Sequence, residues 1–476
     1  MKALRIILSL PLLAFCLACS PRPSIDFKLS WAGDKIHVDM SMNPIRQGTD
    51  TLYYGDIGYG GQRDIFGCVK DLRMNVPFCT DSANLRIILQ IPDKKKVTAS
   101  YDIACSLPDT GVVNTPMEMF RPNITQDFLF CHGVNLFLRY NDRVGRDLPV
   151  QVSWDEIPPF PTFCLYNQGQ GFRTARAPSS AFQSTILVGD RHLHVDTVHV
   201  AGQTQFIVTA PRKLAEYNLA MTTSFFKDFY AAAVRFWEDT PEGPYSLIVY
   251  PFERIRHNVS GIGLDGGFCA RYDAQADTVV TPARADVYAH EIGHNWVSAG
   301  FSSQWYGEGF NELQTAYLLV ASGLRPLQGF VDYLNVGIRS LERSAIRNLP
   351  NDEIEENFWK LGDYSWLPYW RGEVYALRLL GQIEAHTGDP TAFKSLMLFL
   401  KRSGTQVNND NWIGILKNFI PEETAREEFQ RYIIQGESIP LDRGPLPSGL
   451  DFQRQEDGTP GIVITDSTAF ARHFVL

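Results

Sequence analysis

The sequence has few of the features that mark fibrous, disordered or nucleic-acid-binding chains. Glycine and proline are modest, at 37 and 28 of 476 residues, and no segment repeats, so collagen-like and low-complexity proteins are excluded. No run of lysine or arginine exceeds the three at Lys94–Lys96, and the net charge is −9. A phosphate backbone requires a basic surface, so we expect no nucleic-acid partner. The 44 % of apolar residues is enough for several domains with their own cores.

The cysteines lack the CxxC spacing of a zinc ribbon, which excludes that kind of metal site. The chain has eight cysteines, and an even number, six, remain after Cys19. In an oxidising compartment six cysteines can form up to three disulfides, whose pairing the sequence does not define. The alternative is that several are buried free thiols. The six are Cys68, Cys79, Cys105, Cys131, Cys164 and Cys269.

The N-terminus reads as an export signal. Lys2 and Arg5 precede an apolar run over residues 6–18, which is too short to span a membrane comfortably. The end of this run, Leu17–Cys19, resembles the box of bacterial lipoproteins, in which the cysteine is lipidated and becomes the mature N-terminus. The resemblance implies a signal peptide over residues 1–19, a membrane anchor at Cys19 and a place in the bacterial cell envelope. The alternative is a soluble exported protein.

The hydrophobic pattern changes along the chain and predicts an α+β fold. Residues 20–180 contain short alternating runs, which favour an N-terminal antiparallel β domain. Residues 181–330 mix strands with a long helix from Lys213 to about Asp239, and residues 331–440 form a helical domain. The last segment, 441–476, is too short for an independent domain of ordinary size.

One helical stretch contains the pattern H-E-x-x-H as His290, Glu291 and His294. Two histidines four residues apart lie on one face of a helix, so both imidazoles can reach one Zn²⁺. The intervening Glu291 can then take a proton from zinc-bound water. The pattern predicts a zinc-dependent hydrolase.

A catalytic zinc needs a third protein ligand. The metzincin pattern would place this ligand at position 300, but that residue is Gly300, which instead can end the helix. Glu308 and Glu312 lie one turn apart in the next helical stretch, and either could be the ligand.

The segment around Glu308 resembles a known family. Glu308, Gly309 and Phe310, with Trp305 ahead of them, resemble the E-G-F element that follows H-E-x-x-H in gluzincin peptidases of the glycyl aminopeptidase and, more distantly, aminopeptidase N families. This match implies a thermolysin-like catalytic domain over residues 181–330, with Glu308 as the third ligand. Thirteen residues separate His294 from Glu308 where aminopeptidase N has 18, so Glu312 stays the rival.

Two further elements bear on the substrate. The segment Pro368–Gly372 resembles the P-Y-x-K-G element of the same families, which implies that Tyr369 stabilises the oxyanion, with Arg371 in place of the usual lysine. These families also bind the substrate amine with a glutamate on a strand before the zinc helix. Asp265 is the residue that could match this glutamate, and the alternative is that Asp265 is a turn residue.

The resemblance implies a zinc metallopeptidase that acts on a peptide or protein substrate with Zn²⁺ as its cofactor. An aminopeptidase is the more specific form of this hypothesis. A second hypothesis is an envelope lipoprotein that keeps the peptidase fold but only binds peptides. The unmatched spacing and the weak substrate element motivate the second hypothesis.

Overall fold

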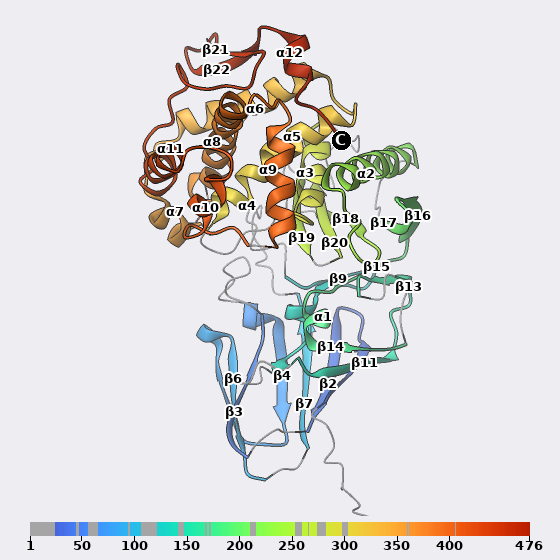
Figure 1. Cartoon of the computed structure of the whole chain (residues 1–476). Helices are drawn as coiled ribbons and strands as arrows, with labels where there is room; N and C mark the ends of the chain where they lie inside the picture. The colour runs from blue at the N-terminus through green and yellow to red at the C-terminus, as the bar shows by residue number, and fades with distance from the viewer. Residues whose placement is uncertain are drawn as a thin grey trace, which may run out of the picture.

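The computed structural model describes residues 24–43, 47–55, 65–93, 96–105, 121–140, 147–166, 169–170, 173–209, 216–252, 259–264, 266–273, 282–297, 303–358, 360, 362–404 and 406–476. Cys19, the rest of the predicted signal peptide and Asp265 lie outside these residues. Within them, no helix combines the length and apolar character needed to cross a membrane. Strands fill the N-terminal part and helices the C-terminal part (Figure 1).

The N-terminal part contains three sheets, because its short runs alternate buried and outward residues. In β2, Ile36, Val38 and Met40 are buried while the residues between them are more exposed. The six-stranded sheet, ordered β14-β11-β1-β2-β7-β4, comprises β1 (Ile25–Trp31), β2 (Lys35–Met42), β4 (Val69–Met74), β7 (Val97–Ala104), β11 (Pro149–Glu156) and β14 (Thr174–Pro178). Its pairs are antiparallel except for β1 with β11, which is parallel.

Two smaller sheets complete this part. The four-stranded sheet, β10-β3-β6-β5, comprises β3 (Gly48–Tyr53), β5 (Phe78–Asp81), β6 (Arg86–Ile91) and β10 (Arg139–Tyr140). The five-stranded sheet, β13-β12-β15-β9-β8, comprises β8 (Asn123–Thr125), β9 (Phe128–His132), β12 (Thr162–Cys164), β13 (Gly169–Gln170) and β15 (Ile186–Asp190). Short helical turns lie at Ile65–Cys68, Ser82–Asn84, Gly133–Asn135 and α1 (Ser179–Gln183). β15 therefore pairs with N-terminal strands although it follows residue 180, where we place the domain boundary.

A mixed sheet and two helices form the central part. The sheet, ordered β16-β17-β18-β20-β19, comprises β16 (His194–Val200), β17 (Gln203–Thr209), β18 (Ser246–Phe252), β19 (Val259–Leu264) and β20 (Gly267–Asp273). The predicted long helix is α2 (Glu216–Trp237), and α3 (Pro282–Gly293) carries the start of the H-E-x-x-H pattern. Helix α3 packs against the edge strand β19 and its neighbour β20. This edge strand is the part of the sheet that borders the candidate site.

Helices form the rest of the chain and surround α3 (Figure 1). They are α4 (Gln304–Gly307), α5 (Gly309–Ala321), α6 (Leu327–Arg343), α7 (Asn351–Asn357), α8 (Asp363–Thr387), α9 (Ala392–Ser403), α10 (Trp412–Leu416), α11 (Glu422–Glu428), the π-helical turn Phe429–Ile434 and α12 (Ser467–Ala471). A hairpin of β21 (Leu450–Arg454) and β22 (Pro460–Ile464) packs on α6. The prediction of an α+β chain with an N-terminal β domain and a C-terminal helical region is confirmed.

A small apolar core joins the N-terminal strands to the mixed sheet. Phe130 of β9 stacks on Tyr250 of β18 with ring centroids 4.5 Å apart, and Cys269 of β20 belongs to the same cluster. Among the described residues the six cysteines after Cys19 form no disulfide, and four of them are buried. Of the two alternatives left by the sequence, the structure therefore has thiols, most of them buried, and not disulfides.

Candidate metal centre

The H-E-x-x-H segment is not helical throughout. Helix α3 ends at Gly293, so the expectation that the helix runs on to Gly300 is wrong, and His294 is the first residue after it. The chain tightens there because the N–H groups of Trp296 and Val297 both donate to the Gly293 carbonyl at 3.0 Å. The Nδ1 of His294 lies 3.0 Å from the Val297 carbonyl, which closes this turn. The two imidazoles still meet, with ring centroids 4.7 Å apart.

Glu308 joins the two histidines from another element. It is the residue between α4 and α5, at the N-cap position of α5. Its Oε2 lies 3.2 Å from Nε2 of His290 and 3.5 Å from Nε2 of His294, and the two Nε2 atoms are 3.0 Å apart. Among the described residues, these three form the single group of histidine, cysteine and carboxylate side chains that could hold a metal ion. We refer to His290, His294 and Glu308 as the His–Glu cluster.

The groups beside the two Nδ1 atoms favour the neutral tautomer in which each histidine presents its Nε2 atom to Glu308. The Val297 carbonyl can only accept, so the Nδ1 of His294 carries the proton there. The Nδ1 of His290 lies 2.9 Å from Oε1 of Glu312, and an ionised carboxylate also only accepts. In the neutral imidazoles, both Nε2 atoms and the Glu308 oxygen are therefore electron-pair donors that face one another. Such a group favours a cation between the three atoms, either a metal ion or a proton on an imidazole.

Spacing and donor type both fit zinc. Donor atoms held 2.0–2.1 Å from a tetrahedral ion lie about 3.3–3.4 Å from one another, which is close to the separations in the cluster. Two imidazoles and one carboxylate are also the ligand set of catalytic zinc sites, which keep the fourth position open.

The charges of the cluster lead to the same preference. Burial lowers the pKa of His290, but the carboxylates of Glu312 and Glu308 outweigh burial and hold this pKa well above its ordinary value. Burial raises the pKa of Glu308, yet hydrogen bonds with His290 and His294 hold it well below its ordinary value. A positive charge at the centre is therefore favoured.

Glu312, the rival ligand, binds the back of His290 instead. Its Oε1 faces Nδ1 of His290, and its Oε2 accepts a hydrogen bond from the hydroxyl of Tyr333 on α6. A carboxylate in this position fixes the orientation and tautomer of a ligating imidazole. The structure thus brings Glu308 into the cluster and leaves Glu312 behind it.

Glu291 lies between the cluster and the edge strand β19. The side chain is buried, and its pKa is raised by burial in spite of the neighbouring His294 and His290. Gly261 of β19 makes room for it, since a Cβ there would lie 2.6 Å from the Glu291 Cγ, whereas one on Gly263 would make an ordinary contact at 3.4 Å from its Oε2. The raised pKa suits a group that must accept a proton and return it.

Tyr369 covers the other side of the cluster. It lies on α8, and its ring stacks on that of His290 with centroids 5.6 Å apart and an interplanar angle of 21°. Burial, followed by the charges of Glu308 and Glu291, raises the pKa of Tyr369 well above its ordinary value. The phenol therefore keeps its proton and can donate it in a hydrogen bond.

Two glycines hold Tyr369 beside Glu308. A Cβ on Gly309 would lie 2.3 Å from the Cα of Gly372, and one on Gly372 would lie 2.0 Å from the Trp305 carbonyl. Helices α5 and α8 can therefore approach closely only with glycine at both positions. These are the glycines of the two elements that the sequence singled out, so their function in the structure is to join the two elements.

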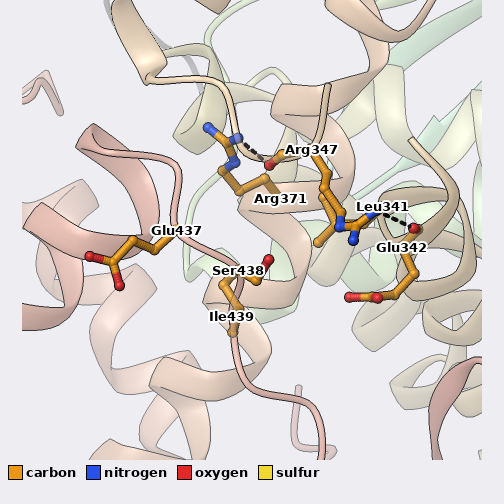
Figure 2. Close-up of a pocket in the computed structure, with 7 residues that line it drawn as sticks. All are labelled: Leu341, Glu342, Arg347, Arg371, Glu437, Ser438 and Ile439. Carbon is orange, nitrogen blue, oxygen red and sulfur yellow. Dashed lines mark hydrogen bonds between the residues drawn. The ribbon is translucent and has the colours of Figure 1, made fainter. Parts of the chain in front are cut away.

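Arg371, which replaces the lysine of the P-Y-x-K-G element, supports the loop before α7. Its buried guanidinium donates to the carbonyls of Arg347 and Leu349 at 2.6 and 2.8 Å, and burial lowers its pKa to about 10. Figure 2 shows it at the edge of a small pocket lined by seven residues, none of which belongs to the His–Glu cluster. This pocket is separate from the candidate metal centre.

Two contributors to the site were not predicted. Asn311 donates from Nδ2 to the His290 carbonyl at 2.8 Å, and a Cβ on Gly293 would lie 2.1 Å from the Asn311 Oδ1. Asn311 follows Glu308 by three residues, and that spacing is the signal that could have identified it. Tyr333 lies on another helix, and nothing in the sequence connects it to Glu312.

Glu355 gives a pH-dependent prediction at the helix before Glu308. It accepts a 3.1 Å hydrogen bond from the N–H of Gln304, the first residue of α4, and burial raises its pKa from 4.5 to about 7. A carboxyl with a raised pKa stabilises the fold at low pH and loses that contribution as the pH rises through the folded value. Between about pH 5 and pH 8, the natural protein should therefore lose about 2–3 kcal/mol of unfolding free energy that Glu355→Gln does not lose. Denaturant unfolding at both pH values measures this, and a constant difference would contradict it.

Comparison with known proteins places this architecture in a class. No protein-family profile and no curated protein sequence matches the chain. Among solved structures, an aminopeptidase N family protein from Idiomarina loihiensis matches with a TM-score of 0.70 and 15% identity, over 91% of this chain and 79% of that one. An M1 zinc metallopeptidase from Deinococcus radiodurans matches with a TM-score of 0.52 and 15% identity, over 88% and 95%. Yeast LTA4 hydrolase matches with a TM-score of 0.52 and 12% identity, over 89% and 68%.

The chain thus has the gluzincin fold of the aminopeptidase N and M1 zinc metallopeptidases. This confirms the resemblance at the level of the fold. The similarity to the glycyl aminopeptidase family in particular stays a prediction, because none of these three neighbours is named as a glycyl aminopeptidase.

Proposed function

We propose that this protein is a zinc-dependent peptidase that hydrolyses peptide bonds with an activated water. The observation that carries the proposal is the convergence of three potential metal-ligand atoms, the two imidazole Nε2 atoms of His290 and His294 and the Oε2 of Glu308, at separations of 3.0–3.5 Å. Bound there, Zn²⁺ would polarise the substrate carbonyl and lower the pKa of water. The zinc peptidase fold of the chain supports this reading of the cluster.

The chain's own residues would perform the proton transfers. The carboxylate of Glu291 accepts a proton from the attacking water and then donates it to the amine that leaves. The hydroxyl of Tyr369 donates a hydrogen bond to the negative charge that develops on the carbonyl oxygen. Glu312 keeps His290 in the tautomer that presents Nε2 to the centre. As part of this proposal, Asp265 binds the free amine that an aminopeptidase substrate carries. Asp265 lies outside the described residues.

Metal removal tests this function. The purified protein should contain about one zinc per chain and cleave members of a mixed peptide library. A zinc chelator should abolish cleavage, and added Zn²⁺ should restore it. Elemental analysis and mass spectrometry of the peptides measure both results. Stoichiometric zinc without cleavage of any peptide would favour the hypothesis of a peptide-binding lipoprotein.

We also propose that Cys19 carries a lipid and anchors the protein in the bacterial cell envelope. The box at Leu17–Cys19 supports this proposal. The protein isolated from membranes should have an intact mass equal to residues 19–476 plus a lipid group. Cys19→Ala should release the protein from the membrane fraction, and a protein that stays bound would contradict the anchor.

A further inference from the structure

An exposed aromatic surface lies at the start of α8, beside the candidate metal centre. Trp366 is 52% exposed, while the next two residues, Leu367 and Pro368, are buried. Its ring centroid lies 5.2 Å from that of Tyr369 and 6.5 Å from that of Trp370, and it is within 12° of parallel to Trp370. Residues three and four positions apart share a helix face, so these aromatic side chains form one surface. Two partly buried rings therefore hold one exposed ring in place.

This surface begins at the His–Glu cluster. Tyr369 stacks on His290 with centroids 5.6 Å apart, and Trp366 is the next ring beyond Tyr369. An extended peptide advances about 3.3 Å per residue, and its side chains reach further to each side. A substrate held with its cleaved bond at the cluster would therefore bring a neighbouring side chain to Trp366.

The exposed indole favours an apolar or aromatic side chain at this position, and the nearby carboxylates disfavour an acidic one. The acidic groups Glu291, Glu308 and Glu312 surround His290, whereas the exposed face next to Tyr369 is an indole. Burying apolar area against an exposed indole is favourable, and aromatic pairs gain further when their centroids are 4.5–7 Å apart.

We propose that Trp366 forms an apolar subsite that selects an aromatic or large aliphatic side chain next to the cleaved bond. This inference rests on the proposed peptidase function and names its substrate class. It makes Trp366 a specificity determinant, because its ring would contact the substrate and take no part in the proton transfers.

Three variants separate this role from a general surface effect. Trp366→Ala removes the indole, and Trp366→Phe keeps an aromatic ring at the same position. The matched control is Val336→Ala on α6, because Val336 is also an exposed apolar side chain, at 60% exposure, and lies outside the aromatic surface. All three changes are at exposed side chains, so we expect the fold to tolerate them.

The test compares pairs of peptides that differ only by alanine or phenylalanine at one of the residues flanking the cleaved bond. The natural protein should prefer phenylalanine, and Trp366→Ala should lower kcat/KM for that peptide at least tenfold, mainly through KM. The alanine peptide should stay within twofold, Trp366→Phe should keep most of the preference, and Val336→Ala should keep all of it.

Unchanged discrimination in Trp366→Ala would overturn the subsite and leave the peptidase function intact. Failure of the zinc-loaded natural protein to cleave either peptide of any pair would overturn the peptidase function, and the subsite with it. The two failures are therefore distinguishable.

Discussion

Replacing Glu308 with alanine should remove zinc from the protein and abolish peptide cleavage. The variant leaves two imidazoles, which is one ligand fewer than catalytic zinc sites use. Glu312→Ala should keep zinc, with an affinity lowered about 10–100-fold, because Glu312 orients His290 from behind. Elemental analysis of both variants beside the natural protein measures zinc per chain, and a competing chelator measures affinity.

The pair of variants is its own control, since both remove a carboxylate from neighbouring turns of one segment. Loss of zinc in Glu312→Ala with retention of zinc in Glu308→Ala would instead make Glu312 the zinc ligand. The absence of zinc from the natural protein after attempted reconstitution would contradict the metal centre altogether.

Replacing Glu291 with glutamine should leave zinc in place and lower kcat by about 10²–10⁴, the range that general acid–base catalysis contributes. Glutamine has nearly the same shape as glutamate, so it fits the space that Gly261 leaves. It cannot accept the proton of the attacking water, however. Zinc content, the unfolding midpoint and kcat are measured on the same preparation.

Equal zinc content and stability would show that the loss of activity comes from proton transfer. Full activity in Glu291→Gln would show that this carboxylate does not act as the base. Loss of zinc in this variant would instead indicate a structural role for Glu291.

The sequence was sufficient where local spacing fixes geometry. His290 and His294 are one turn apart in any helix, and their rings meet even though α3 ends between them. The alternation of residues in β2 predicted a strand with one buried face, and the pattern after Lys213 predicted most of α2. Glu308 was preferred over Glu312 from its neighbours in the chain, and the structure places Glu308 in the cluster.

The rest of the site depends on packing between distant segments, which the spacing of residues does not encode. The hydroxyl of Tyr333 reaches Glu312 only because α6 packs against α5. Asn311 of α5 occupies the space beside Gly293 and donates to the His290 carbonyl, which again joins two separate helices. Arg371 was recognised as a substitution, but its partners at Arg347 and Leu349 come from a loop that no motif marks.

The contact between Gly309 and Gly372 has a mechanical consequence. The backbones of α5 and α8 are in contact at these glycines, without side chains between them. We therefore expect little sliding or tilting of one helix against the other. Glu308 adjoins one glycine and Tyr369 is one helical turn from the other, so the two groups must travel together as a single rigid piece.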